Sequence, residues 1–142
     1  MGDRVVHTLS DRQVDDLMAL YAGEFWCAHR TRDRVLNLLR HTSLITGIVD
    51  DGGRLVAFCR VLTDFEYRAT LYDVIVAPGR RGEGLGAKVV DAMLNHPKMA
   101  SVESVYLACK PEMAPFYQRW QFSSDFGDTI WMRRRRGGRD SC

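Results

Sequence analysis

Helical periodicity marks two segments in the first third of the chain. Ser10 and Gln13 have the spacing of a capping box, and apolar residues recur at helical intervals over residues 14–21. Thr31 has the side chain of a helix cap, and the apolar positions within 35–39 share one face of a second, shorter helix. The pattern therefore predicts two amphipathic helices in succession.

The middle of the chain changes from helical periodicity to strand-like apolar runs. Residues 43–49, 54–63 and 69–76 read as three strands, and residues 50–53 (Asp-Asp-Gly-Gly) have the composition of a hairpin turn. Residues 4–8 could supply a short strand before the first helix. These segments predict a meander in which neighbouring strands are antiparallel.

The last part of the chain predicts a crossover followed by further strands. A helix begins near Gly84 and stops before Pro97, and the near-continuous apolar run Val102–Cys109 is typical of a strand covered on both faces. Residues 112–120 read as a helix and residues 122–134 as a last pair of strands.

The order of elements predicts one α/β (α+β) domain with a mixed, mostly antiparallel sheet and helices on both of its faces. We expect the domain to span residues 1–132, followed by a basic tail at residues 133–142.

The charge of the chain is uneven. Net charge is +2, but residues 133–140 hold five arginines and one acid, which leaves 15 basic against 17 acidic residues elsewhere. A mildly acidic body is not the surface of a nucleic-acid-binding protein. Because no apolar run reaches the roughly 20 residues that cross a bilayer, and residues 1–11 lack a signal-like apolar stretch, we expect no membrane partner and a cytoplasmic location.

The cysteines and histidines do not predict a metal site. None of the four cysteines forms a C-x-x-C pair, and no cysteine–histidine cluster has zinc spacing. Cys59 and Cys109 lie in apolar runs, so we expect both to be buried free thiols.

The segment Arg81–Gly86 carries the clearest chemical signal. A buried-type strand leads directly into Arg-Gly-Glu-Gly-Leu-Gly, and a helix follows. Glycines allow the backbone to turn with its N–H groups exposed, and the start of a helix adds partial positive charge. Such a loop can bind a pyrophosphate.

Three phosphate-binding patterns compete for this loop. The P-loop pattern is excluded because Leu85 stands where its lysine should be. The dinucleotide fingerprint fails because Val89 occupies the position of its third glycine. The remaining pattern is R-x-x-G-x-G preceded by V-x-P.

That pattern, over Val76–Gly86, resembles the GNAT superfamily of N-acetyltransferases. The similarity continues in Ala114–Phe122, which resembles the family's A-x-x-x-Y-x-x-x-G-F region, and residues 25–31, 58–64 and 71–74 resemble short bacterial GNAT proteins of mostly unassigned substrate. The chain departs from the family at two positions, where Gln121 replaces a usual glycine and Lys110 a common asparagine.

The resemblance implies acetyl-CoA as co-substrate, with no metal, and it implies roles for particular residues. Backbone groups of Val74 and Val76 would bind the pantetheine arm and the thioester. Backbone N–H groups would hold the pyrophosphate at the following positions: Arg81, Gly82, Gly84, Gly86 and Ala87. Arg80 and Lys88 are nearby cations that could assist.

Three residues are candidates for catalysis. Tyr117 matches the family's tyrosine and would protonate the departing thiolate, although helical spacing also allows a packed core tyrosine. Asp73 interrupts an apolar strand, so it either binds or deprotonates the acceptor amine or forms a structural ion pair. Glu24 is a weaker candidate base, and a surface acid is the alternative.

The sequence therefore predicts an N-acetyltransferase that moves an acetyl group to a primary amine of a small molecule or peptide. Transfer would be direct, within a ternary complex. A non-catalytic CoA-binding regulatory module is the alternative. Nucleic acid is not expected as a partner, and the chain would be a monomer or a homodimer.

Overall fold

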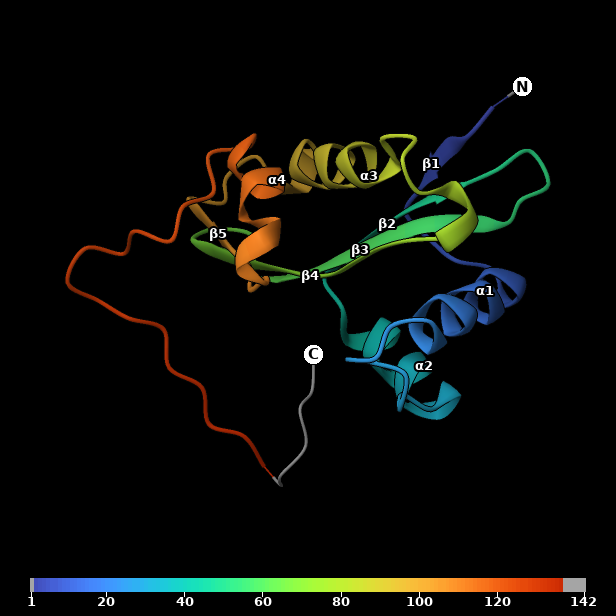
Figure 1. Ribbon diagram of the computed structural model, residues 1–142, viewed down its shortest axis with the longest axis horizontal. Helices are drawn as coiled ribbons and strands as arrows, with labels where there is room; N and C mark the ends of the chain where they lie inside the picture. Colours follow the sequence, from blue (N-terminus) through green and yellow to red (C-terminus); the bar gives the residue numbers. More distant parts are fainter. Residues whose placement is uncertain (1, 137–142) are drawn as a thin grey trace.

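A single five-stranded sheet organises the computed structural model, which describes residues 2–136 (Figure 1). The strands are β1 (Arg4–Val6), β2 (Leu44–Val49), β3 (Leu55–Thr63), β4 (Arg68–Val76) and β5 (Ser104–Tyr106). The α-helices are α1 (Asp11–Ala22), α2 (Arg32–His41), α3 (Leu85–Leu94) and α4 (Ala114–Gln118). Short 3-10 turns are formed by Pro78–Arg80, Pro97–Met99 and Pro111–Met113.

The strands lie in the order of the sequence, from β1 to β5. The first four pair antiparallel, and only the β4–β5 pair is parallel, because the chain crosses over through α3 between these two strands. The predicted mixed, mostly antiparallel sheet is confirmed. The predicted hairpin turn joins β2 to β3, where Gly53 has φ 79° and the Asp50 carboxylate accepts from the N–H groups of Gly52 and Arg54.

The two predicted helix caps are also present. The Ser10 hydroxyl accepts from the Gln13 N–H at 3.2 Å, and the Gln13 side chain accepts from the Ser10 N–H at 3.0 Å. This reciprocal capping box starts α1. The Thr31 hydroxyl accepts from the Arg34 N–H at 3.4 Å at the start of α2.

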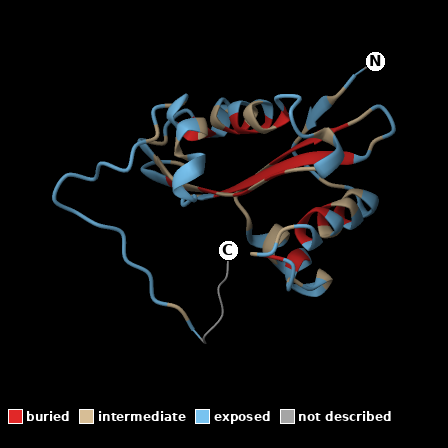
Figure 2. Cartoon of the chain, in the orientation of Figure 1, coloured by how far each residue is buried: buried red, intermediate tan, exposed pale blue. Residues whose placement is uncertain are grey.

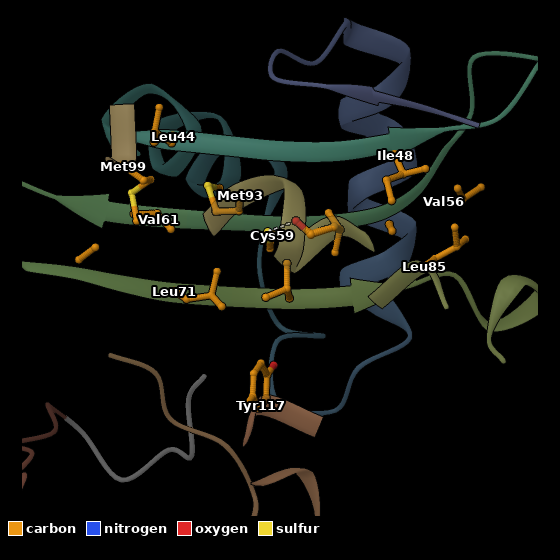
Figure 3. Packing of buried hydrophobic residues seen from close by; sticks show 14 residues of the cluster. Leu44, Ile48, Val56, Cys59, Val61, Leu71, Leu85, Met93, Met99 and Tyr117 are labelled. Carbon is orange, nitrogen blue, oxygen red and sulfur yellow. Dashed lines mark hydrogen bonds between the residues drawn. The ribbon is translucent and has the colours of Figure 1, made fainter. Parts of the chain in front are cut away.

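Helices cover both faces of the sheet, so the core has two parts. Figure 1 shows α3 on one face and α1 with α2 on the other, and Figure 2 shows buried residues concentrated on the strands between them. Val89, Val90 and Met93 of α3 pack on strand residues such as Val61 and Leu71 (Figure 3). On the opposite face the second cluster is formed by the following residues: Leu17, Leu20, Tyr21, Cys27, Val35, Val49, Leu55, Phe58 and Ile75.

The strand expected over Val102–Cys109 is much shorter than predicted. β5 covers only Ser104–Tyr106, and none of its residues is fully buried, because it lies at the edge of the sheet and pairs with β4 alone. Cys59 is buried as expected, but Cys109 is exposed, so the expectation of a second buried thiol was wrong.

The pair of strands expected over residues 122–134 is absent. The chain after Phe122 leaves the body as an exposed loop (Figures 1 and 2). Local side-chain bonds favour turns here: Ser123 accepts from the Asp125 N–H at 3.0 Å, and Asp125 accepts from the Gly127 N–H at 2.9 Å. Such bonds compete with a strand ladder. Arg139 and Asp140 of the predicted tail lie outside the described residues.

A bulge in β4 changes which face of the sheet its side chains meet. Between the pairs Phe58↔Ile75 and Arg60↔Tyr72, β4 has one residue more than β3. Asp73 lies in this bulge with φ 57°, a left-handed conformation. Before the bulge Leu71 packs in the α3-side core, whereas Ile75 after it packs in the core beneath α1 and α2.

The side chain of Asp73 is held by three donors. Its carboxylate accepts from Arg60 Nε at 2.6 Å, from Arg30 Nη1 at 2.8 Å and from the Tyr21 hydroxyl at 2.9 Å. Burial by itself would raise the Asp73 pKa, but the bonds and charges of Arg30 and Arg60 outweigh it, so the pKa lies below its ordinary value. We call Asp73, Tyr21, Arg30 and Arg60 the bulge cluster.

The bulge cluster leads to a prediction about stability. Asp73→Asn retains the size of the side chain and its tolerance for a left-handed backbone, but removes the charge that the two guanidinium groups share. Unpairing buried charges in this way costs about 3 kcal/mol or more of unfolding free energy, measured by denaturant unfolding at pH 7. The matched control is Asp15→Asn, which breaks the exposed Arg32–Asp15 pair and should cost less than about 1 kcal/mol.

The same variant gives a pH signature. Since the folded pKa of Asp73 lies below the unfolded value of about 3.9, its contribution is complete well above that value and is lost as pH falls towards the folded pKa. The stability gap between wild type and Asp73→Asn should therefore narrow below about pH 4. A gap that stayed constant from pH 7 to pH 3 would show that ionised Asp73 does not stabilise the fold.

Candidate functional site

The loop between β4 and α3 has a run of unused backbone donors. Among the described residues, no N–H group from Arg81 to Ala87 donates to an acceptor in the chain, whereas the Arg80 N–H bonds Ala77 and the Lys88 N–H bonds Gly84. Gly82 and Gly84 have φ values of 82° and 80°, which turn the backbone into this arrangement. The loop thus presents successive N–H groups at the start of α3, a geometry that favours an anion.

A cavity of about 220 Å³ opens over this loop. Its lining combines the loop with the side of α4 and consists of the following residues: Val76, Arg80, Arg81, Gly82, Gly84, Leu85, Gly86, Ala87, Phe116 and Arg119. The Phe116 ring of α4 packs near Gly86, since a Cβ at this glycine would lie 3.4 Å from it. The predicted loop residues therefore line one concave surface, together with part of α4.

The two arginines of the loop are already engaged by acids. Arg80 bonds Asp3 at 2.7 Å and Glu83 at 2.9 Å, and these partners raise its pKa. Arg81 bonds Glu24 at 3.0 Å, and its Nε donates to the Val76 carbonyl at 3.3 Å. The expected cation Arg80 is thus neutralised by its neighbours.

Arg119 is a cavity residue that sequence reasoning missed. Its guanidinium lies 4.8 Å from the centre of the Phe116 ring and 5.5 Å from that of Trp120. No acid among residues 2–136 forms an ion pair with it. The spacing of Phe116 and Arg119, three residues apart in a helix, was the signal that could have placed them on one face.

The strands β4 and β5 separate beside the loop. The two strands pair from Arg68↔Ser104 to Thr70↔Tyr106, and beyond Thr70 β4 has no partner in β5. The edge of β4 from Leu71 to Val76 therefore has no strand partner on the β5 side. Val74 and Val76, both expected to bind through their backbones, lie on this part of β4.

Tyr117 lies near the end of α4 and is buried, with only 8% of its surface exposed. Figure 3 shows it beyond β4, apart from the residues packed under α3. Rings of Phe116, Trp120 and Phe122 surround it at centroid distances of 4.9 to 6.5 Å. Desolvation, with smaller contributions from Cys109 and Cys59, raises the Tyr117 pKa to about 12, so the hydroxyl keeps its proton at neutral pH.

The other two candidate catalytic residues, Asp73 and Glu24, lie apart from Tyr117. Asp73 has the structural ion pair that was one of its two expected alternatives, and its lowered pKa makes it a poor proton acceptor. Glu24 pairs with Arg81 next to the loop. No contact joins either acid to Tyr117 among the described residues.

Two further sequence departures have a structural outcome. Gln121, at the usual glycine position, adopts φ 64°, so the left-handed backbone is retained without the glycine. Lys110 lies with its ammonium 4.8 Å from the centre of the Phe25 ring.

Cys109 is a poor nucleophile, because partial burial and the nearby Glu112 charge raise its pKa.

Within residues 2–136, no three acidic, histidine or cysteine side chains are grouped as a metal site would require. None of the helices in this described part is both long and apolar enough to cross a bilayer.

Comparison with known proteins gives matches along most of the chain. The uncharacterized N-acetyltransferase ycf52 of Porphyra purpurea is 30% identical over 99 residues, which cover 68% of this chain and 57% of that protein. Serotonin N-acetyltransferase 2, chloroplastic, of Oryza sativa subsp. japonica is 28% identical over 68% of this chain and 50% of its own length. The chain thus aligns with only half to three-fifths of the length of these relatives.

A solved structure gives a fuller match. A GNAT-family acetyltransferase structure from Xanthomonas campestris pv. campestris superposes with a TM-score of 0.78 at 28% identity, covering 93% of both chains. The sequence model of the Acetyltransferase (GNAT) family matches residues 12–122, which include the N–H-rich loop and Tyr117. On these grounds the chain belongs to the GNAT family of acetyltransferases.

Proposed function

We propose that this protein transfers an acetyl group from acetyl-CoA to a primary amine of a small molecule or peptide. The observation that carries the proposal is the run of unused N–H groups from Arg81 to Ala87 at the start of α3. The first N–H groups of any helix lack an acceptor within the helix, and the loop before α3 adds further donors of this kind. A cavity lined by these donors suits the pyrophosphate of acetyl-CoA.

In this proposal the co-substrate lies along the loop and the open edge of β4. The N–H groups of Arg81, Gly82, Gly84, Gly86 and Ala87 bind the pyrophosphate oxygens. Backbone groups of Val74 and Val76 bind the pantetheine arm and the thioester, as a strand partner would. The thioester then reaches the gap where β4 and β5 part.

The chemistry joins the amine directly to the acetyl carbon. The neutral amine nitrogen attacks the thioester carbonyl, the C–N bond forms and the C–S bond breaks. The departing thiolate takes the Tyr117 proton. The nitrogen then loses a proton to water, and this proton returns through water to the Tyr117 oxygen, which restores the tyrosine. The Tyr117 hydroxyl suits this donor role because it is protonated throughout the neutral range.

The acids have supporting roles in this scheme. Asp73 holds the bulge in β4 and has a pKa too low for a general base near neutral pH. Glu24 fixes Arg81, whose Nε donates to the Val76 carbonyl beside the pantetheine path. Amine deprotonation is therefore assigned to water.

A non-catalytic CoA-binding module is the alternative function. It would use the same loop and cavity but would not require a protonated tyrosine beside the thioester path. The presence of Tyr117, which matches the family's tyrosine, favours the enzyme. A turnover assay separates the two functions.

The loop itself can be tested with Gly84→Asp. The new side chain meets no atom within 4 Å, but it places a negative charge among the donors and strains a backbone with φ 80°. Acetyl-CoA affinity measured by calorimetry should fall at least about tenfold.

The matched control for this test is Gly53→Asp. Gly53 has φ 79° and equally open space, so it experiences the same backbone strain in the distant β2–β3 turn. The control should bind acetyl-CoA as wild type does. Equal affinity of wild type and a folded Gly84→Asp protein would remove the loop from the site.

The role of Tyr117 can be tested with Tyr117→Phe, which removes the hydroxyl and keeps the ring packing. Loss of a general acid should lower kcat by about 10²–10⁴-fold, with a smaller change in the KM for acetyl-CoA. Tyr106→Phe is the control and should leave kcat unchanged, because Tyr106 stacks on Phe126 and does not line the cavity over the loop. A full-speed Tyr117→Phe enzyme would restrict Tyr117 to a packing role.

The acceptor class can be tested by an acetylation screen. Exposed Phe25 and Tyr67 lie in segments that the family resemblance places beside the acceptor, where they suit an aliphatic stem carrying an amine. We expect turnover on members of a panel of amino acids, polyamines, aminoglycosides and basic peptides, with full-length protein and with protein truncated after Met132. Activity confined to basic proteins and lost on truncation would contradict a small-amine acceptor.

A further inference from the structure

We propose that residues 126–136, which we call the C-terminal segment, adsorb to the surface of an anionic lipid bilayer. The inference is independent of the proposed function, because it concerns neither acetyl-CoA nor the acceptor amine. The C-terminal segment contributes no residue to the lining of the cavity over the loop, so adsorption leaves that cavity open.

Three consecutive apolar side chains of the C-terminal segment face solvent. Ile130, Trp131 and Met132 have 79%, 59% and 85% of their surface exposed. Among residues 2–136, no other large apolar side chain is as exposed as Ile130 and Met132. Single exposed apolar residues are ordinary, whereas a contiguous exposed group marks a contact surface.

The C-terminal segment leaves the body beside β5. The Trp131 ring lies 4.8 Å from the Tyr106 ring, and the Phe126 ring lies 6.3 Å from it. Beyond these contacts the chain runs outside the body (Figure 1), and Figure 2 shows it exposed along nearly all of its length. None of residues 126–136 belongs to either core cluster. The body therefore does not bury this apolar run.

Four arginines follow the apolar run without a break. Residues 133–136 are all arginine, and the one acid of the C-terminal segment is Asp128. Within the described part of the chain, Arg133, Arg134 and Arg136 form no ion pair. The segment thus carries a net positive charge directly beside exposed apolar side chains.

An anionic bilayer matches both parts of the C-terminal segment. Its acidic headgroups attract the arginines. Tryptophan and aliphatic side chains enter the boundary between headgroups and acyl chains. One weak signal gives only marginal membrane binding, whereas two together give a stable contact. The expectation of no membrane partner rested on the lack of a long apolar run, which excludes spanning and not adsorption.

A nucleic acid is the competing polyanion, and two observations disfavour it. Outside residues 133–140 the chain holds 15 basic against 17 acidic residues, so the body would repel a long polyanion that extends across it. Binding to phosphates would also leave Ile130 and Met132 in water. A bilayer meets the C-terminal segment alone and buries these two side chains.

The test is co-sedimentation of the full chain with lipid vesicles at low salt. Phosphatidylcholine vesicles that contain about 30 mol% phosphatidylserine should bind wild type at least about tenfold more tightly than pure phosphatidylcholine vesicles. The double variant Arg133→Gln/Arg134→Gln should lose most of this preference, because it removes half of the arginine run. Its matched control, Arg34→Gln/Arg40→Gln, removes two exposed arginines of α2 and should keep the preference.

Insertion of the apolar run has a separate readout. Tryptophan emission should shift to shorter wavelength when anionic vesicles are added. Trp131→Phe should abolish the shift, although Trp26 and Trp120 remain. Met132→Ser should weaken vesicle binding several-fold, because it removes apolar contact and leaves the charge. Unchanged emission from wild type on anionic vesicles would refute insertion.

Three further outcomes would overturn the proposal. Equal binding to the two kinds of vesicle, or binding to neither, would show that anionic lipid is not the partner. An equal loss in the α2 control would assign the binding to overall charge. A single-stranded RNA oligomer that bound wild type more tightly than the anionic vesicles would identify nucleic acid as the partner. Acetyl-CoA affinity, measured in the same variants, should stay at the wild-type value, so the proposed function is tested separately.

Discussion

The hydrogen bonds and ion pairs between the Asp73 carboxylate and its three donors fix the shape of β4 beside the candidate site. A left-handed aspartate in a central strand is unfavourable unless surrounding groups fix it. Arg30, Arg60 and Tyr21 supply that restraint from the segment before α2, from β3 and from α1. The bulge places Ile75 in the core beneath α1 and α2, while Val74 and Val76 pack on the α3 side. The pairing of β4 with β5 ends at Thr70, just before the bulge. The open strand edge thus lies next to a buried ionic cluster that holds it in shape.

In the loop at the end of β4, the polar side chains and the polar backbone groups have different roles. Arg80 and Arg81 form ion pairs with acids from distant parts of the chain, and these pairs hold the loop in place. The backbone, not the side chains, is left to receive an anion. The cations Lys88 of α3 and Arg119, which follows α4, form no ion pair among the described residues.

Much of the fold could be predicted because its signals are local. The capping residues Ser10 and Thr31, the turn at Asp50–Gly53 and the glycines before α3 each act on residues close by in sequence. The errors arose where the outcome depended on distant partners. The apolar run at Val102–Cys109 predicts a covered strand, but the position of β5 at the sheet edge left it short and left Cys109 exposed. Likewise, the cavity forms only where Phe116 of α4 packs near Gly86, a contact between residues far apart in the sequence that no local pattern reveals.

The ion pair between Arg80 and Asp3 also bears on how the protein forms during synthesis. Its partners are separated by 77 positions, so the segment made first must wait for the loop before the bond can close. The far wall of the cavity, Phe116 and Arg119, is made later still. A chain that ends between the loop and Phe116 can form the Arg80–Asp3 ion pair but lacks the far wall of the cavity. The cavity over the loop therefore takes shape only after β4, the loop and α4 have all been made.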